Sequence, residues 1–446
     1  MNFAINSFGF WMIYFTVIFS STLFVIKSKV ELNKFSIGSV VYYSIFLFAF
    51  LGYPAIYFKI VPYYINSGLT DNNIISKMFI ISSLVIIQFF LGYYLCFIYL
   101  EKPRPKKRNF LNYLKLKYLN KKFEVSIITW TLFFIICMIF LVYYLNKVPN
   151  VALIEALKGK SSVEIAQSRS DMTNAFPKYH WFRIILKNIL PFLSTISLLE
   201  LLKTKSKSWM IVFILSFFVV CFVMLMDAQK APIIWYFLSL IAVLAVYYNR
   251  GVDFKSALIV SAFALGFLFL SYVFFMDSKI EFLTILNPLR RGLTGQITPF
   301  YRYIEIIPDT IPFQYGKTFP NPRGIFPIEH FNYTVEISKI AKGGFNNGII
   351  SSAPTAFWGE LWVNFGWYGI FIIPILFGTL VYLLHYYFSK SKLSTIGMAL
   401  MVWFAFDLKD LAFTGFSGYL FPVSIVMILF ICGVLTILNN DNIKRF

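Results

Sequence analysis

The residues best suited to chemistry in this chain are Arg and Lys side chains that interrupt an otherwise apolar sequence. Arginine forks match pairs of phosphate oxygens, and lysine supplies a compact point charge. A group of such side chains therefore suits an anionic ligand, with a diphosphate as the natural candidate. For any one of them, a solvated loop charge is the simpler interpretation, whereas the group as a whole favours anion binding. The candidates are Arg169, Lys230, Arg290, Arg291, Arg302 and Arg323.

Carboxylates and histidines that could move a proton are scarce. Glu360 lies in the aromatic and glycine-rich run 358–369, where it could pair with an arginine or accept a proton from a hydroxyl group. Pairing is the simpler role for it. His330 follows Arg323 and Glu329 and is a second possible proton acceptor. Glu360 and His330 are therefore the candidate catalytic residues.

Other kinds of chemistry have no support in the sequence. The three histidines and four cysteines have no metal-ligand or disulfide spacing, and the cysteines all fall inside apolar blocks. We find no phosphate-binding P-loop, dinucleotide glycine pattern or nucleophile elbow. We therefore expect no metal and no cofactor.

Apolar blocks of about twenty residues dominate the chain, and this length matches a helix that crosses the hydrocarbon core of a bilayer. Hydrophobic residues make up 59% of the sequence and charged residues 13%, with a mean hydropathy of +0.71. Backbone groups in lipid must be satisfied internally, so the blocks must be helices. We predict an all-α polytopic membrane protein with about eleven transmembrane helices. The spans are expected near residues 5–26, 37–58, 78–100, 125–146, 182–202, 209–226, 231–248, 256–275, 362–388, 395–413 and 417–438.

Orientation follows from the short basic loops, which all fall on one side when every span is counted. The longest of them is the stretch 101–124, and basic residues on short loops mark the cytoplasmic side. The N-terminus is then outside and the C-terminus is cytoplasmic. The first span has no basic leader and reads as a retained helix. The basic residues form no single patch, which argues against nucleic acid as a partner.

Two long loops, 147–181 and 276–361, face outward in this topology. The predicted organisation is eight spans within residues 1–275, a large external loop at 276–361, and three spans within 362–446. A loop as long as the second is usually functional, and its mixture of Pro, Gly and aromatic residues predicts that it folds over the outer face of the helices. Five of the candidate cations lie in these two loops, and Lys230 lies in a short outward turn at 227–230. The usual sorting of charge across membranes gives no reason for basic residues on this side.

Lys187 is the clearest single signal, because an ionisable group inside an apolar span is costly and usually faces a cavity or a partner. Snorkelling toward the interface explains the neighbouring Arg183 well and Lys187 less well.

Several segments resemble the Wzy-type O-antigen and capsule repeat-unit polymerases of bacteria. The local similarity consists of Ser351 to Pro354, Gly359-Glu360, Asn364 to Gly366, and Gly369, at the start of a span. Gly316 to Pro320 and Asn321 to Gly324 are similar as well, and Asp227 to Pro232 resembles a short turn in which related polymerases and ligases carry a basic residue. One departure is that the arginine–ten–glycine spacing of some members is absent after Arg169, Arg291 and Arg302.

The resemblance implies a GT-C-like polymerase or ligase architecture and a glycosyltransferase of the bacterial inner membrane that takes part in surface polysaccharide (lipopolysaccharide) biosynthesis. Such an enzyme transfers a growing glycan from polyprenyl diphosphate (undecaprenyl diphosphate) to a hydroxyl of a new lipid-linked unit. The cations named above would then bind diphosphate, and Glu360 would be preferred over His330 as the base. A chain-length regulator and a repeat-unit flippase are the expected protein partners.

Three alternatives remain open at this stage. An O-antigen ligase uses the same donor but delivers the glycan to a lipid A core. A flippase or transporter of lipid-linked sugars predicts polar groups in the middle of several spans, where this chain has almost none beyond Lys187. A scaffold without chemistry would leave each outward cation dispensable.

Overall fold

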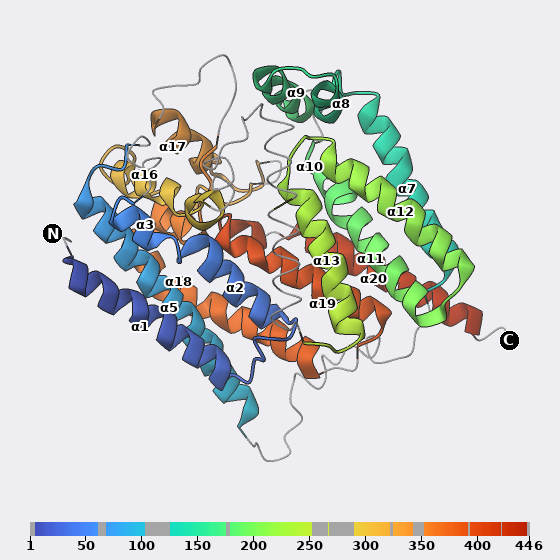
Figure 1. Ribbon diagram of the computed structural model, residues 1–446, viewed down its shortest axis with the longest axis horizontal. Coiled ribbons are helices and arrows are strands. Elements are labelled where there is room, and N and C mark those ends of the chain that lie inside the picture. The colour runs from blue at the N-terminus through green and yellow to red at the C-terminus, as the bar shows by residue number, and fades with distance from the viewer. Residues whose placement is uncertain are drawn as a thin grey trace. The chain divides into compact units, whose positions relative to one another are not determined.

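The computed structural model describes residues 5–60, 68–102, 125–174, 179–251, 266, 290–321, 324–341, 352–390, 393–420 and 422–443. The regular elements in this part of the chain are all helical (Figure 1). Within the described ranges, eight helices are long and apolar enough to cross a membrane, which confirms a polytopic, all-helical membrane protein. They span Ser7–Lys27, Ile37–Tyr57, Asn72–Glu101, Ile127–Leu145, His180–Thr204, Lys207–Leu225, Phe357–Lys390 and Ser417–Thr436.

The other three predicted spans account for the difference from eleven. The span at 231–248 is a shorter apolar helix, α13 (Ala231–Tyr247). The span at 395–413 becomes helix α19 (Thr395–Leu408), which ends beside Asp407, Lys409 and Asp410 and continues as a 3₁₀ turn, η4 (Lys409–Ala412). The span at 256–275 lies outside the described residues apart from residue 266. The count of about eleven stays a prediction.

By its internal contacts the chain forms two compact units, and each is described by itself. The first comprises Met1–Pro105, Leu286–Tyr387 and Asp407–Phe421; the second comprises Lys106–Ile285, Phe388–Phe406 and Pro422–Phe446. The predicted division at residues 276 and 361 follows spans and loops rather than contacts, and stays a prediction.

The first unit is built around the long helix α5, which packs against α1 and α18. A Cβ on Gly92 of α5 would overlap the backbone of Ile375, and one on Gly378 of α18 would overlap the backbone of Phe89. Glycines thus let these two helices approach closely, as is common where helices pack in lipid. The helices of this unit are α1 (Ser7–Lys27), α2 (Ile37–Ala49), α3 (Tyr53–Tyr57), α5 (Asn72–Glu101), α16 (Thr298–Ile306), α17 (Tyr333–Ala341), α18 (Phe357–Lys390) and the 3₁₀ turns η4 and η5 (Ser417–Tyr419).

Helix α18 is broken at Gly366, whose backbone (φ 53°, ψ −132°) is not helical. The break interrupts the helical hydrogen bonding of the preceding turn, and two carbonyls in that turn accept bonds from the external loop. The Val363 carbonyl accepts from the Gln314 N–H (2.9 Å), and the Asn364 carbonyl accepts from the Tyr315 N–H (3.1 Å). The loop is therefore docked on the broken helix.

The second unit is a bundle in which α11 and α12 form a tight antiparallel hairpin against α13. Small polar side chains lie between these helices: the Ser194 hydroxyl bonds to that of Tyr236 (2.7 Å), and Ser197 bonds to Ser216 (3.3 Å). Such bonds join helices without exposing polar atoms to lipid. The helices are α7 (Ile127–Leu145), α8 (Ala152–Leu157), α9 (Ser162–Asn174), α10 (Tyr179–Ile184), the π-helical η1 (Ile185–Ile189), α11 (Leu190–Thr204), α12 (Lys207–Leu225), α13, α19 and α20 (Val423–Ile443). Figure 1 shows α8 and α9 as a short helical pair at the end of α7.

Candidate functional site

The short turn between α12 and α13 contributes Asp227 to a largely buried ion pair with Lys187. The Lys187 ammonium pairs with Asp227 Oδ2, and the two side chains are 14% and 7% exposed. The position of Lys187 in an apolar span predicted a cavity or a partner, and Asp227 is that partner. Lys187 lies on η1, and π-helical turns inside α-helices are frequent at functional sites. Asp227 Oδ1 has no hydrogen-bond partner among the described residues.

Of the predicted diphosphate-binding cations, Lys230 lies in the same turn and Arg169, on α9, contacts it. Arg169 Nη2 donates to the Ala228 carbonyl (2.6 Å), and Ala228 has a left-handed backbone (φ 50°). Lys230 immediately precedes α13. We call Arg169, Lys187, Asp227 and Lys230 the turn cluster. Its three cations and one carboxylate give the turn cluster a net formal charge of +2.

Arg169 is positioned by a helical hairpin formed by α8 and α9. The Leu153 N–H donates to the Met226 carbonyl (3.0 Å), which ties α8 to the residue before Asp227. The Tyr144 hydroxyl donates to the Met172 carbonyl (3.1 Å), which ties α9 to the end of α7. The predicted outward loop 147–181 is thus, where described, a folded element fixed to the turn.

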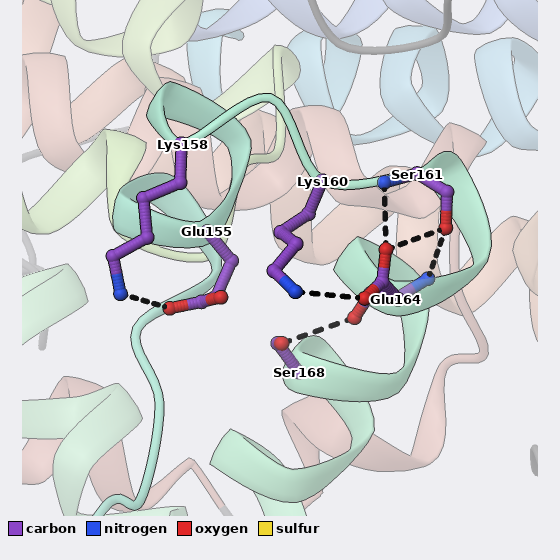
Figure 2. Close-up of polar contacts among 6 residues, drawn as sticks. All are labelled: Glu155, Lys158, Lys160, Ser161, Glu164 and Ser168. Carbon is purple, nitrogen blue, oxygen red and sulfur yellow. Dashed lines mark hydrogen bonds and ion pairs between the residues drawn. The ribbon is translucent and has the colours of Figure 1, made fainter.

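The first turn of α9 is closed by a capping box (Figure 2). The Glu164 carboxylate accepts from the Ser161 N–H (2.9 Å) and the Lys160 ammonium (3.1 Å), while the Ser161 hydroxyl caps the Glu164 N–H (3.3 Å). Lys158 pairs with Glu155 (2.8 Å). Two loop lysines are therefore paired locally on the surface, which separates them from the turn cluster and makes them suitable controls.

We expect the α9 cap to survive mild acid. The Ser161 backbone N–H, with Lys160 and the Ser161 hydroxyl, lowers the pKa of Glu164 from 4.5 to about 2. A lowered pKa means that the stabilisation is complete above pH 4.5 and is lost as pH falls toward 2. Hydrogen exchange of residues 162–166, corrected for intrinsic rates, should show protection at pH 4 in the wild type and less in Glu164→Gln. Equal protection in both proteins would contradict this assignment.

In the first unit, Arg302 of α16 is already engaged. Its guanidinium pairs with Glu305, lies over the ring of Tyr301 (5.4 Å from Cζ to the centroid), and abuts the backbone of Gly68. Arg290 is half-buried and Arg291 is exposed. Arg323 lies outside the described residues. Diphosphate binding by these four arginines stays a prediction.

Glu360 is fully buried in the first turns of α18, and both of its oxygens accept hydrogen bonds. Oε1 accepts from the Thr318 hydroxyl (2.6 Å) and Oε2 from the Ser417 N–H (2.9 Å). A Cβ on Gly415 would overlap the carboxylate, so glycine there permits the approach. Glu360 therefore joins the external loop, α18 and the start of η5 through polar partners, whereas the sequence favoured pairing with an arginine.

Asn364 extends this network one helical turn along α18. Its Nδ2 donates to the Thr318 hydroxyl (2.7 Å), and its Oδ1 accepts from the Gly316 N–H (2.8 Å). Two of the segments that carry the family resemblance, 316–320 and 364–366, thus meet here. Two tyrosines lie near this network. Burial raises the pKa values of the Tyr303 and Tyr333 hydroxyls well above the ordinary value for tyrosine, and the nearby Glu360 raises them further. Both hydroxyls therefore stay protonated.

His330 is exposed, and its Nδ1 lies 3.0 Å from the Phe319 carbonyl oxygen. A carbonyl only accepts, so Nδ1 carries a proton, which leaves Nε2 as the ring nitrogen that can accept one. The Phe331 N–H donates to the Lys317 carbonyl (2.8 Å), which fixes the ring beside the same loop that Glu360 holds. Of the two catalytic candidates, His330 has the geometry of a proton acceptor at the surface.

No family model, curated protein or solved structure matches this chain. Within the described ranges, no three or more His, Cys, Asp or Glu side chains are grouped so as to hold a metal ion.

Proposed function

We propose that this protein polymerises lipid-linked oligosaccharide repeat units, transferring the growing glycan from polyprenyl diphosphate to a hydroxyl of a new lipid-linked unit. The turn cluster is the observation that supports the proposal most. It lies after the last residue of α12, while Lys203, Lys205 and Lys207 lie at the other end of that helix. Nineteen residues of helix span about 28 Å, close to the thickness of a hydrocarbon core.

Excess positive charge at that end runs against the usual sorting of charge across a membrane, which places basic residues on the cytoplasmic side. An anionic ligand outside the membrane gives a reason for it. A diphosphate is matched by the guanidinium of Arg169, which carries five N–H donors in a fork, together with the point charge of Lys230. Because both substrates carry a diphosphate, Arg290 and Arg291 in the other unit also have an anion to bind.

The proposed step is a displacement at the anomeric carbon of the donor. Its bond to the diphosphate oxygen breaks, and the electron pair leaves with the diphosphate, whose charge the cations stabilise. The acceptor hydroxyl oxygen forms the new glycosidic bond, and its proton passes to a general base. Glu360 acts as a positioning residue, because its oxygens are buried and bonded to Thr318 and Ser417.

A chain-growth assay tests the proposal. Purified protein with a synthetic repeat unit on polyprenyl diphosphate should give a ladder of glycans. Arg169→Gln should slow chain growth by about 10²–10³, as expected for the loss of one preorganised donor to the leaving group. Lys158→Gln, in the same hairpin, is the matched control and should leave the ladder unchanged.

Two results would oppose the proposal. If the wild-type protein leaves the repeat unit unextended, polymerisation is ruled out. If it transfers glycan only to an added lipid A core, the ligase is favoured. An Arg169→Gln ladder equal to the wild type would remove the turn cluster from the reaction.

A further inference from the structure

The loop 314–318 has a buried side and an exposed side. Gln314, Gly316 and Thr318 are buried against α18, where Gly316 and Thr318 bond to the Asn364 side chain. The alternate residues, Tyr315 and Lys317, are exposed, and Tyr315 is 76% exposed. The buried network of Glu360 and Asn364 thus fixes a short platform whose outer side consists of one aromatic ring and one ammonium group.

The backbone of Tyr315 is strained. Its φ of 45° lies in the left-handed region, which is an outlier for a bulky residue. Three hydrogen bonds hold it there: Gln314 N–H to Val363, Tyr315 N–H to the Asn364 carbonyl, and Gly316 N–H to Asn364 Oδ1. Strain that the surroundings enforce in this way occurs mainly at ligand and active sites. Glycine would adopt this backbone without strain. The presence of tyrosine here therefore indicates that its ring has a role.

The ring of Tyr315 is supported from behind. Phe313 meets it edge to face, with ring centroids 6.4 Å apart, and Phe313 in turn packs on Trp362 (5.9 Å) and on the backbone of Gly366. An aromatic face that is rigid, exposed and next to a hydrogen-bond donor matches the apolar face and polar rim of a pyranose ring.

We propose that Tyr315 and Lys317 bind a sugar ring of the oligosaccharide. The tyrosine ring stacks on the C–H face of the pyranose, and the lysine ammonium donates to a hydroxyl or carboxylate oxygen of the same sugar. The inference deepens the proposed function, because it names the glycan as the part of the substrate that this loop holds. It assigns binding only, and no bond is made or broken there.

The test measures binding of a lipid-free glycan to the full-length protein. The probe is the mixture of oligosaccharides released by mild acid from the surface polysaccharide of the source cells, and binding is followed by saturation-transfer NMR in detergent. Tyr315→Gly should weaken binding by about tenfold, the scale of one aromatic contact. Its unfolding temperature should not fall, because glycine relieves the strain. Tyr315→Phe should bind as the wild type does, because the ring remains.

Tyr368, which is 82% exposed on α18, provides the matched control. Tyr368→Ala should leave glycan binding unchanged. Equal binding by Tyr315→Gly and the wild type, or no binding by the wild type, would overturn the platform. A lower unfolding temperature in Tyr315→Gly without weaker binding would mark a structural tyrosine or an anchor at the membrane surface.

The outcomes also separate the two proposals. A wild-type protein that makes the glycan ladder while Tyr315→Gly binds glycan normally would reject the platform alone. Glycan binding that depends on Tyr315 without any ladder would reject polymerisation and keep the platform.

Discussion

Replacing Lys187 with methionine should lower the free energy of unfolding by about 3–5 kcal/mol, because Asp227 would stay buried without its cation. The methionine keeps the length of the side chain, so the lost charge dominates over lost packing. Thermal unfolding in detergent, followed by circular dichroism, gives the measurement. The ion pair joins η1 to the turn after α12, so the same change should also displace Arg169 and Lys230 and abolish chain growth.

A double variant separates structure from chemistry at this site. Replacing a buried ion pair with apolar residues of similar volume is often neutral or stabilising. Lys187→Met combined with Asp227→Leu should therefore recover the stability and most of the chain growth, because Arg169 and Lys230 are both retained. A stable but inactive double variant would instead place the Lys187 ammonium on the diphosphate.

Replacing Glu360 with alanine should lower the free energy of unfolding by about 3–5 kcal/mol, since the Thr318 hydroxyl and the Ser417 N–H would be left buried without an acceptor and a cavity would open. Glu360→Gln should have a smaller effect of about 1–2 kcal/mol, because the amide oxygen can satisfy only one of the two donors. The unfolding temperature and the glycan ladder should be measured on the same preparations.

The contrast with His330 decides which residue acts as the base. His330→Gln should slow chain growth by about 10²–10⁴ at unchanged stability, as the loss of an exposed proton acceptor does. Thr318→Val should reproduce the stability loss of the Glu360 variants. A Glu360→Gln protein that is as stable as the wild type but inactive would make Glu360 the base and contradict a positioning role.

The membrane-spanning helices were largely predictable from the sequence. A helix that crosses a bilayer needs an apolar block of about twenty residues. Such blocks can be recognised directly in the sequence, as in Ile127–Leu145 and Lys207–Leu225. Helix α18 begins at Phe357, before its predicted start at 362, because Glu360 finds a partner far away in the chain. Hydropathy treats such polar residues as the end of a span, and no local pattern reveals their partners.

The site was predictable only in part, for the same reason. The cost of a charge in lipid marked Lys187, but its partner Asp227 lies 40 residues away and meets it only in the folded bundle. The pairing of Arg302 with Glu305 follows from helical spacing, and the sequence interpretation missed it. Nothing in the sequence predicted the left-handed backbone of Tyr315, because bulky residues disfavour that conformation.

Binding of polyprenyl diphosphate to the purified protein tests the central claim most directly. The ligand can be followed by ³¹P NMR in detergent, with Arg169→Gln/Lys230→Gln compared against Lys158→Gln/Lys160→Gln, which removes the same formal charge from two surface ion pairs. The turn-cluster variant should bind about 100-fold more weakly, as expected for two lost charge-assisted bonds, and the surface variant should bind as the wild type does. Equal losses in both variants, or none in either, would contradict a diphosphate site at this turn.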